Sequence, residues 1–465
     1  MVTRIEKDSL GQKDVPAEAY YGLQSVRAME NFPISGLRMH PRMVEAIVMV
    51  KKAAALANTD LGLLKPEVSK AIAAAADEII AGRLRDQFVV DVYQMGAGTS
   101  FNMNANEVLA NRAIEILGGK IGDYALVHPN DHVNMAQSTN DVIPTAMRVA
   151  ARLLLRELLL VLKDLETALA AKAKEFDGIL KSARTHLQDA VPIRLGQEFA
   201  AYAATVGKCH ERIAAAARSL EELGIGGSAA GTGLNTHPQY RFKLLEHLRA
   251  WTKIDWRNAP DMREAMQSNL PIAEASSALR LLAIELTRIC NDLRLLASGP
   301  TTGFAEIMLP AVQPGSSIMP GKVNPSMAEM LNMVCFQVIG NDLTVSMAVQ
   351  AGQLELNVMM PVMAHNLHQS IETLKNALRV FIDRCIVGIV ADADRCRRYA
   401  ESSMALATAL NTYVGYARAA EVVKRALREQ KTIIDVVREE KLLTEEQIAQ
   451  ILDPVKLTEP GLPGR

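Results

Sequence analysis

Apolar residues spaced three and four positions apart begin near residue 42 and occupy most of the chain. This spacing places apolar side chains on one face of a helix and predicts α-helices. The clearest run begins at the Asn140-Asp141 pair and continues to Phe176 without a helix breaker, roughly 50 Å of helix at 1.5 Å per residue. Other long helices are predicted at residues 195–223, 271–297, 325–353 and 361–390.

The apolar residues of these long helices cover more than one face, as at Leu153 to Leu155, so several neighbours must cover each helix. Five such helices exceed a four-helix bundle and favour either one elongated bundle or association between chains. Strand signals are weak and lie mainly near the N-terminus. Beyond about residue 395 the predicted helices become short. The pattern therefore predicts a mainly all-α chain with an N-terminal mixed part, a centre of long helices and a small helical tail.

Composition narrows the classes of function. Hydrophobic residues make up 49% and charged residues 22%, which is typical of a globular protein. With 51 basic and 52 acidic residues, the chain has no general positive field for gathering nucleic acid or membrane phosphates, and we predict neither as a partner. The N-terminal MVTRIEKDSLG has no apolar signal region, and no uncharged apolar run is long enough to span a membrane.

The residues that could bind metal are scattered. The five cysteines never form a C-x-x-C pair, which favours reduced thiols and a cytoplasmic location. His365 and His368 have a helical spacing that could ligate a metal, but no nearby carboxylate or cysteine completes a set. We predict no metal site.

Three polar segments interrupt the apolar pattern where helices begin or end, and helix starts offer free N–H groups and a positive dipole to anions. In GAGTSFNMN, residues 96–104, Thr99 or Ser100 is expected to cap the following helix. QSTND, residues 137–141, carries more hydrogen-bonding side chains than one cap needs, which suggests a ligand carboxylate. RTHLQD, residues 184–189, sets His186 among polar neighbours, although a single histidine is more often structural.

A fourth segment, GSSIMPGKVNP at residues 315–325, is rich in glycine and proline. It is not a phosphate-binding P-loop, because five residues separate Gly315 from Gly321 and Val323 follows Lys322. The glycines permit unusual backbone angles and suit a mobile lid. Hydrogen-bonding side chains come from Ser316, Ser317, Lys322 and Asn324. A connector between helices rarely needs so many polar groups, so we expect a functional loop.

The same segments carry a family resemblance. GSSIMPGKVNP resembles the signature loop of the aspartase/fumarase superfamily, and GAGTSFNMN, NDHVNMAQSTND, RTHLQDAVP, GTGLNTHP and AGQLELNV resemble its other motifs in the same order. The resemblance covers essentially the whole chain. The forms GAGTS, QSTND, AYYG and AGQLELN are similar to aspartate ammonia-lyases, whereas class II fumarases tend toward GSGTQ, QSSND, LWG and GNFELN. GTGLNTHP and His186 are common in fumarases as well.

This resemblance implies a reaction and an assembly. The reaction is the reversible anti elimination of ammonia from L-aspartate, a small dicarboxylate, to give fumarate through an aci-carboxylate and without a cofactor. The assembly is a homotetramer in which the long helices merge into one central bundle and three subunits build each active site. The chain would then have an N-terminal domain at 1–140, a central domain at 141–395 and a C-terminal domain at 396–465.

The resemblance also assigns roles to the matching positions. The β-carboxylate, which becomes the aci-carboxylate, would be held by Thr99, Ser138, Thr139 and Ser317. The α-carboxylate would be held by Thr185, Lys322 and Asn324. Asn140 and His186 would lie near the amino group, with Glu329 as a partner of the histidine. Ser316 would be the general base, acting as an alkoxide that the backbone N–H groups of the loop and Lys322 stabilise.

Two positions depart from the family pattern and leave the substrate open. Thr301 follows Ser298-Gly-Pro, where an arginine is common, and Met360 stands where aspartases commonly have glutamate. The loss of an arginine and a glutamate could mean that an internal pair has been swapped for uncharged residues, or could mark a pocket for a different leaving group or a bulkier substituent. The alternatives are a class II fumarase and a relative that eliminates a substituted amine. A non-catalytic scaffold is disfavoured because the candidate site residues are all retained.

Overall fold

The computed structural model describes residues 2–463. The chain forms two compact units, here called unit 1 and unit 2. Unit 1 consists of Met1–Leu159, Glu211–Ala283 and Cys335–Lys375, and unit 2 consists of Leu160–His210, Ile284–Val334 and Asn376–Arg465. The boundaries fall inside the long helices, so these helices contribute residues to both units.

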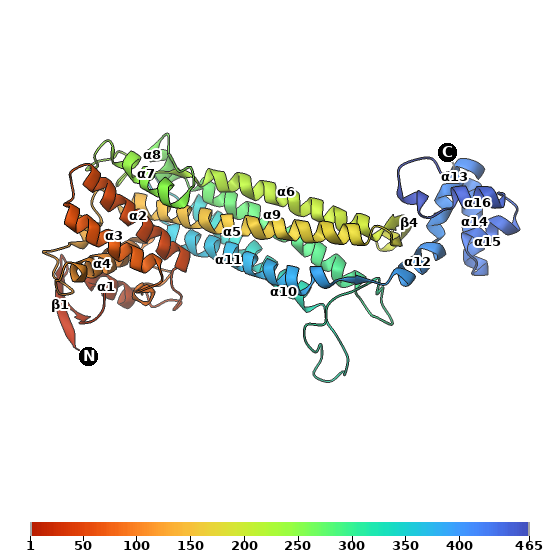
Figure 1. Ribbon diagram of the computed structural model, residues 1–465, viewed down its shortest axis with the longest axis horizontal. Coiled ribbons are helices and arrows are strands. Elements are labelled where there is room, and N and C mark those ends of the chain that lie inside the picture. Colours follow the sequence, from red (N-terminus) through yellow and green to blue (C-terminus); the bar gives the residue numbers. More distant parts are fainter. Residues whose placement is uncertain (1, 464–465) are drawn as a thin grey trace. The chain divides into compact units, whose positions relative to one another are not determined.

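The five long helices predicted from the sequence are present and are labelled α5, α6, α9, α10 and α11 (Figure 1). They span Thr139–Glu175, Leu195–Ser219, Leu270–Leu296, Ser326–Gln350 and Met360–Arg384. Helices α6 and α11 end a few residues earlier than predicted, because the residues that follow each helix form a short β-strand. Strand β5 (Glu222–Leu223) pairs with β6 (Arg257–Asn258), and β8 (Val390–Ala391) pairs with β7 (Ile307–Met308).

Unit 1 begins with an antiparallel hairpin of β1 and β2, followed by short and medium helices. Its further elements are β1 (Thr3–Asp8), β2 (Gly11–Pro16), α1 (Leu23–Asn31), α2 (Pro41–Asp60), α3 (Pro66–Ile80), α4 (Thr99–Ile116), α7 (Tyr240–Thr252) and α8 (Met262–Gln267). Helix α1 starts at Gly22 without a side-chain cap of its own. The buried Glu107 carboxylate of α4 accepts the Gly22 N–H at 2.9 Å and the Gln24 N–H at 2.8 Å instead.

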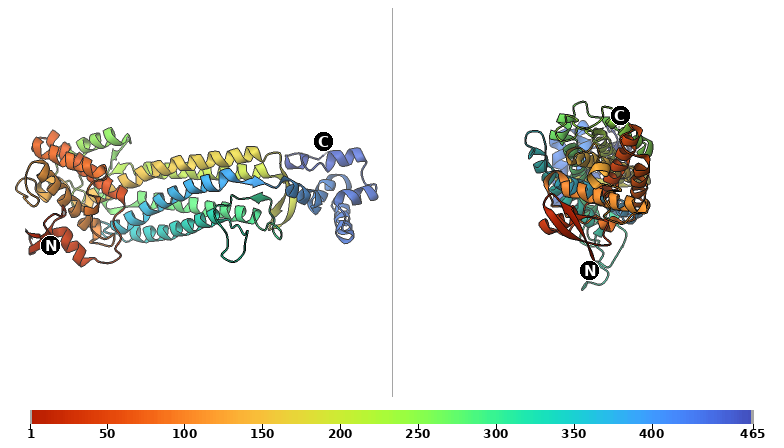
Figure 2. Two further views of the ribbon diagram at one scale, coloured as in Figure 1. Left: turned by 60° about the horizontal axis from the view of Figure 1, so that its bottom comes forward. Right: turned by 90° about the vertical axis from the view of Figure 1, so that its left-hand side faces the viewer.

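Unit 2 contains a hairpin that the sequence did not reveal, formed by β3 (Leu180–Thr185) and β4 (Gln188–Arg194). Its strands are largely polar, so they lack the apolar alternation that indicates a strand. The tail folds into α12 (Ala393–Ser402), α13 (Asn411–Val414), α14 (Tyr416–Glu429), α15 (Ile433–Glu439) and α16 (Glu445–Ile451). Helices α14, α15 and α16 share one hydrophobic cluster, and they lie together in the left-hand view of Figure 2.

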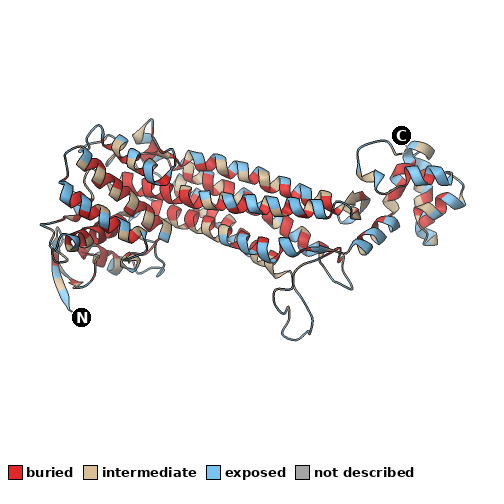
Figure 3. Ribbon diagram, in the orientation of Figure 1, coloured by how far each residue is buried: buried red, intermediate tan, exposed pale blue. Residues whose placement is uncertain are grey.

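Helix α10 leaves an apolar stripe exposed. Met333, Phe336, Leu343 and Met347 are 57–64% exposed. Their spacing of three, seven and four residues places them along one side of the helix, as in a coiled-coil seam. Figure 3 shows both buried and exposed faces along the long helices. No helix among residues 2–463 has the length and apolar character needed to cross a membrane.

Candidate active site

The QSTND segment, residues 137–141, runs into the start of α5 at Thr139. Its hydrogen bonds show which side chains support the fold and which are available to a ligand. Asp141 is fully buried, and its carboxylate accepts the N–H groups of Ser138 at 2.9 Å, Gly226 at 3.0 Å and Ser228 at 2.9 Å. Burial raises the pKa of Asp141 to about 7, while these N–H groups oppose the shift. Asp141 therefore ties the glycine-rich segment at 224–233 to α5 and is not exposed to a ligand.

Ser138, Thr139 and Asn140 are only half-buried. The Ser138 hydroxyl oxygen accepts the Asn140 N–H at 3.2 Å, so Ser138 caps α5, which begins at Thr139, one residue before the predicted start at the Asn140-Asp141 pair. Asn140 donates from Nδ2 to the Ala229 carbonyl oxygen at 2.8 Å. A hydroxyl that accepts a backbone N–H keeps its own hydrogen for another acceptor, and the Asn140 side-chain oxygen stays available to accept.

Behind these groups lies a network of amides that the sequence did not single out. Asn102 Nδ2 donates to Thr139 Oγ1 at 3.0 Å and to Asn134 Oδ1 at 3.3 Å. Asn134 Oδ1 also accepts Lys51 Nζ at 3.3 Å and Asn106 Nδ2 at 3.2 Å. Residues from α2, α4 and the segment before α5 are thereby linked to one candidate substrate-binding hydroxyl.

The start of α4 differs from the prediction. Its cap is Gly98, which has a φ of 85° and contributes no side chain, so the expected capping by Thr99 or Ser100 is wrong. Thr99 is the first helical residue and half-buried, which leaves its hydroxyl free of a capping role. The Ala97 N–H donates to the Val358 carbonyl oxygen at 2.7 Å, so the GAGTS segment contacts the AGQLELNV segment.

In unit 2, the loop at 315–325 extends from the helices around it (Figure 1) and is closed at its base. The Gly315 N–H donates to the Lys322 carbonyl oxygen at 2.7 Å, and Asn324 Nδ2 donates to the Gly315 carbonyl oxygen at 2.7 Å. A Cβ at Gly315 would lie 2.5 Å from the Lys322 carbonyl oxygen, so only glycine fits there. Asn324 is predicted to bind substrate, but its side-chain nitrogen is used to hold the base of the loop together.

Inside this loop, Ser316 has the surroundings that a basic oxygen needs. Its Oγ accepts the N–H of Ile318 at 3.2 Å and the N–H of Met319 at 3.0 Å. Two N–H donors on one oxygen stabilise its charged form and lower the cost of deprotonation. Ser317 and Lys322 are exposed in this loop, and Glu329 lies in the first turn of α10.

The β3–β4 hairpin of unit 2 presents Thr185 and His186 at its tip, both exposed. His186 and Leu187 form a two-residue turn with φ values of 55° and 58°. Such a turn strongly prefers Asn-Gly, and a bulky residue with positive φ is strained. Strain of this kind is concentrated at functional sites, where the side chain matters more than the local preference.

A buried ion cluster supports the hairpin and was also missed by sequence reasoning. The fully buried Glu306 contacts Arg184 Nη1 at 2.9 Å and Lys181 Nζ at 3.1 Å. Lys181 also contacts Glu198 Oε1 at 2.7 Å, and burial raises the pKa of Glu198. Arg184 directly precedes Thr185, so the cluster fixes the strand that carries the predicted substrate-binding residues.

The remaining candidates have simple structural surroundings. Of the two positions that depart from the family pattern, Thr301 is exposed in unit 2 and Met360 is buried at the start of α11 in unit 1. His368 is buried with Nε2 3.1 Å from the Met147 carbonyl oxygen, and burial lowers its pKa to about 3. All five cysteines are buried and none forms a disulfide.

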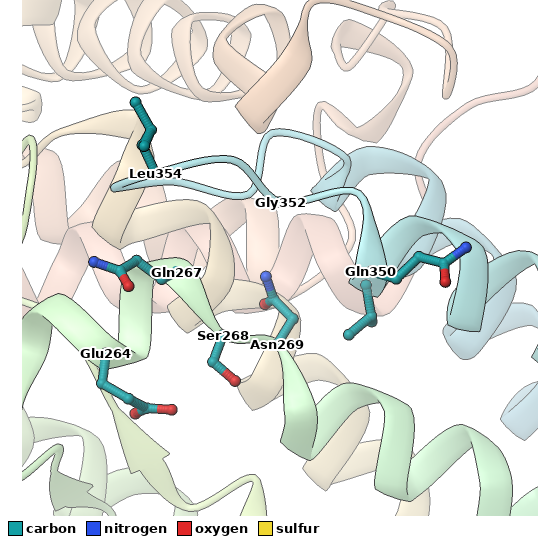
Figure 4. A pocket seen from close by; sticks show the side chains of 8 residues that line it. Glu264, Gln267, Ser268, Asn269, Gln350, Gly352 and Leu354 are labelled. Carbon is teal, nitrogen blue, oxygen red and sulfur yellow. The ribbon is translucent and has the colours of Figure 1, made fainter.

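Two cavities in the described part of unit 1 show how far the predicted residues line open space. One cavity of about 330 Å³ lies between the α8–α9 junction and the segment at 349–354, and Gln267, Ser268 and Asn269 are among the residues that line it (Figure 4). None of the predicted site residues lines it. Thr99 lines another cavity of about 230 Å³ together with Arg27 and Met95. The site is therefore defined by hydrogen-bonding geometry more clearly than by a cavity in one chain.

A mostly helical chain with hydroxyl groups at helix starts and a serine that receives loop N–H groups has the features of a lyase of the aspartase/fumarase superfamily. The sequence matches the lyase family over residues 11–340 and the family of fumarase C C-termini over residues 406–459. The chain belongs to this lyase family, as its motifs predicted.

Named relatives match the chain almost from end to end. It is 50% identical to an aspartate ammonia-lyase of a Bacillus species, covering 99% of both chains. It is 52% identical to a class II fumarate hydratase of Halobacterium salinarum, covering 99% of this chain and 98% of the relative. A solved structure of a fumarate lyase:delta crystallin from Brucella melitensis is 48% identical, with a TM-score of 0.96 over 99% of this chain and 100% of that chain.

Proposed function

We propose that this chain catalyses the reversible anti elimination of ammonia from L-aspartate to give fumarate. The observation that carries the proposal is the pair of loop N–H groups on Ser316 Oγ. A serine hydroxyl is a weak base, whereas an alkoxide that two N–H groups stabilise can remove a proton from carbon. Similarity to aspartate ammonia-lyases of 45–50% identity over nearly the whole chain supports ammonia as the leaving group.

The reaction proceeds in two steps. The Ser316 alkoxide takes the proton from Cβ of aspartate, and the electron pair of that C–H bond moves into the β-carboxylate to form the aci-carboxylate. The electrons then return to form the carbon–carbon double bond while the C–N bond breaks with its electron pair going to nitrogen. An ammonium group leaves as ammonia, which takes up a proton from water, and the Ser316 proton passes to solvent.

The β-carboxylate gains a second negative charge in the first step, so donors placed there stabilise the transition state more than the ground state. We assign this role to Thr99, Ser138, Thr139 and Ser317. The hydroxyl oxygens of Ser138 and Thr139 already accept hydrogen bonds, which leaves their hydrogens to donate to the substrate. Removing one such donor costs about 3 kcal/mol in comparable sites.

The α-carboxylate and the amino group are assigned to the remaining residues. Thr185, Lys322 and Asn324 hold the α-carboxylate. Asn140 and His186 lie near the amino group, and the Asn140 side-chain oxygen is available because its Nδ2 donates to Ala229. Glu329 is proposed as a partner of His186. The resemblance to the family carries these assignments, and no cofactor or metal takes part in them.

We further propose that the protein acts as a homotetramer in the cytoplasm, with each active site built from three subunits. The exposed apolar stripe on α10 supports association, because such a stripe is unfavourable in water. Helix α5 has 37 residues and is about 55 Å long, far longer than a four-carbon dicarboxylate. One substrate therefore cannot extend along such a helix, whereas a site shared between subunits lets groups from different chains meet on one substrate. The three-domain division at residues 140 and 395 belongs to the same proposal.

The test follows fumarate absorbance. Enzyme with L-aspartate should release fumarate and ammonia in equal amounts, and enzyme with fumarate should consume it only when ammonium is present. Ser316→Ala should abolish turnover and leave the assembled state, measured by light scattering, unchanged. Near-normal activity of Ser316→Ala would remove this residue from the mechanism.

A class II fumarase is the second candidate, because a fumarate hydratase is 52% identical over nearly the same length. It would form malate from fumarate without ammonium, so malate in the ammonium-free reaction would replace the aspartase proposal. A relative that eliminates a substituted amine is the third, suggested by Thr301 and Met360. Turnover of N-substituted aspartates in the absence of turnover of aspartate would favour it.

A further inference from the structure

Lys51 lies in α2 at 0% exposure and has no role in the proposed chemistry. Its ammonium group donates to two amide oxygens, Asn134 Oδ1 at 3.3 Å and Gln137 Oε1 at 3.1 Å. Burial lowers the pKa of Lys51 to about 7, and the nearby Asp141 carboxylate opposes the shift. Burying a cation costs free energy unless hydrogen bonds compensate for the lost water, and the two amide oxygens supply such bonds.

Lys51 sets the orientation of the amides around it. Lys51 Nζ donates to both amide oxygens, and its charged form can only donate, so Asn134 turns its oxygen toward Lys51. The Asn134 Nδ2 then donates to the Gln137 carbonyl oxygen at 3.2 Å, which can only accept. The Gln137 amide likewise has its oxygen toward Lys51 and its nitrogen toward a carbonyl, because its Nε2 donates to the Val133 carbonyl oxygen at 3.0 Å.

The orientation passes from Asn134 to Thr139. Because Asn134 presents an oxygen, Asn102 must face it with Nδ2, and the same nitrogen donates to Thr139 Oγ1 at 3.0 Å. A flipped Asn102 would set two amide oxygens against each other. With its oxygen already accepting, the Thr139 hydroxyl has its hydrogen free to donate outward.

We propose that Lys51 is a positioning residue that, through Asn134 and Asn102, holds the Thr139 hydroxyl as a hydrogen-bond donor to the substrate carboxylate. The inference rests on the proposed function, in which Thr139 binds the β-carboxylate. Without Lys51 the observed orientation of Asn134 loses its cationic donor and is favoured only by the Gln137 carbonyl oxygen and by Asn106 Nδ2. Reversed orientations of Asn134 and Asn102 then become more populated, and a reversed Asn102 accepts the Thr139 hydrogen. The hydroxyl is then lost to the substrate although it remains in place.

The experiment is a double-mutant cycle with Lys51→Met and Thr139→Val, measured by steady-state kinetics on the assembled protein. Lys51→Met keeps the length of the side chain and removes its donors. We expect kcat to fall at least 10-fold with KM changed less than 3-fold, because the β-carboxylate gains its charge in the transition state. Lys52→Met is the matched control, since Lys52 is the next residue of α2 and pairs with Asp77 at 2.6 Å, outside the network. It should stay within 2-fold of wild type.

The decisive comparison is in the Thr139→Val background. If Lys51 acts through the Thr139 hydroxyl, Lys51→Met should lower kcat there by less than 2-fold. An equal loss in both backgrounds would overturn the proposal, as would a Lys51→Met enzyme that matches Lys52→Met. If Lys51 had a purely structural role, Lys51→Met would instead lower the melting temperature and kcat by the same amount in both backgrounds.

Asn102→Asp provides a second route if Lys51→Met does not fold. The substitution has the same shape but presents an oxygen to Thr139, so kcat should fall as in Lys51→Met; wild-type kcat would overturn the proposal. Failure of the proposed function is recognised separately. If the wild type converts malate and not aspartate, the same cycle is run with malate. If it converts neither, the affinity for succinate, measured by calorimetry, replaces kcat.

Discussion

Glu306 offers the sharpest test of how unit 2 holds its hairpin. Its carboxylate is fully buried and contacts both Arg184, at 2.9 Å, and Lys181, at 3.1 Å. Glu306→Gln keeps the shape of the side chain and one oxygen but removes the charge. The buried Lys181 and the half-buried Arg184 then lie next to a neutral amide, and only Lys181 keeps a carboxylate partner, Glu198 at 2.7 Å.

Breaking a buried ion pair by removing one partner costs about 3–5 kcal/mol. Because Lys181 retains Glu198, we expect the lower end, about 3 kcal/mol. If the whole chain unfolds cooperatively, this loss lowers Tm by about 3 °C, using an unfolding entropy of about 2.1 cal/mol/K per residue. Arg184 directly precedes Thr185 and His186, so kcat/KM for aspartate should fall as well.

Thermal unfolding monitored by circular dichroism, together with steady-state kinetics, measures both effects. Glu285→Gln is the control: Glu285 pairs with Arg288 at 3.0 Å on the surface of the same unit, and exposed pairs contribute less than about 1 kcal/mol. A Glu306→Gln protein that melts like the control with wild-type kinetics would refute the positioning role of the cluster.

Three further predictions concern other positions. Leu187→Gly should raise Tm, because a left-handed conformation costs a bulky residue about 1–2 kcal/mol and costs glycine little; a lower Tm would show that the turn is not strained. Gly315→Ala should lower kcat/KM at least 10-fold with little change in Tm, because its Cβ would lie 2.5 Å from the Lys322 carbonyl oxygen in an exposed loop; wild-type kinetics would contradict this. Burial raises the pKa of Glu107 to about 7 from 4.5, so the folded chain keeps a proton that the unfolded chain has lost between these pH values. Stability should therefore fall as pH rises through this window, and Glu107→Gln should weaken that slope in denaturant titrations at several pH values.

The candidate site could be predicted where its residues form contiguous motifs. GSSIMPGKVNP and QSTND stand out because their polar residues interrupt long apolar helices, and both segments have the exposed or half-buried hydroxyl groups that the proposed chemistry needs. The individual roles within a motif were harder to predict. Asp141 is an internal support, and Asn324 helps to close its own loop. Such distinctions depend on which neighbour each side chain meets.

The sequence by itself determined the helical class, the five long helices and the superfamily, because apolar spacing and motif order are local properties of the chain. Only the tertiary structure decided that Lys51, Asn102 and Thr139 belong to one network, and that Glu306 supports the hairpin. In the sequence Lys51 and Lys52 are adjacent lysines of one amphipathic helix, and nothing in the local pattern distinguishes them. Contacts between residues far apart in sequence arise from packing, and packing decides which of two adjacent lysines is buried among amides.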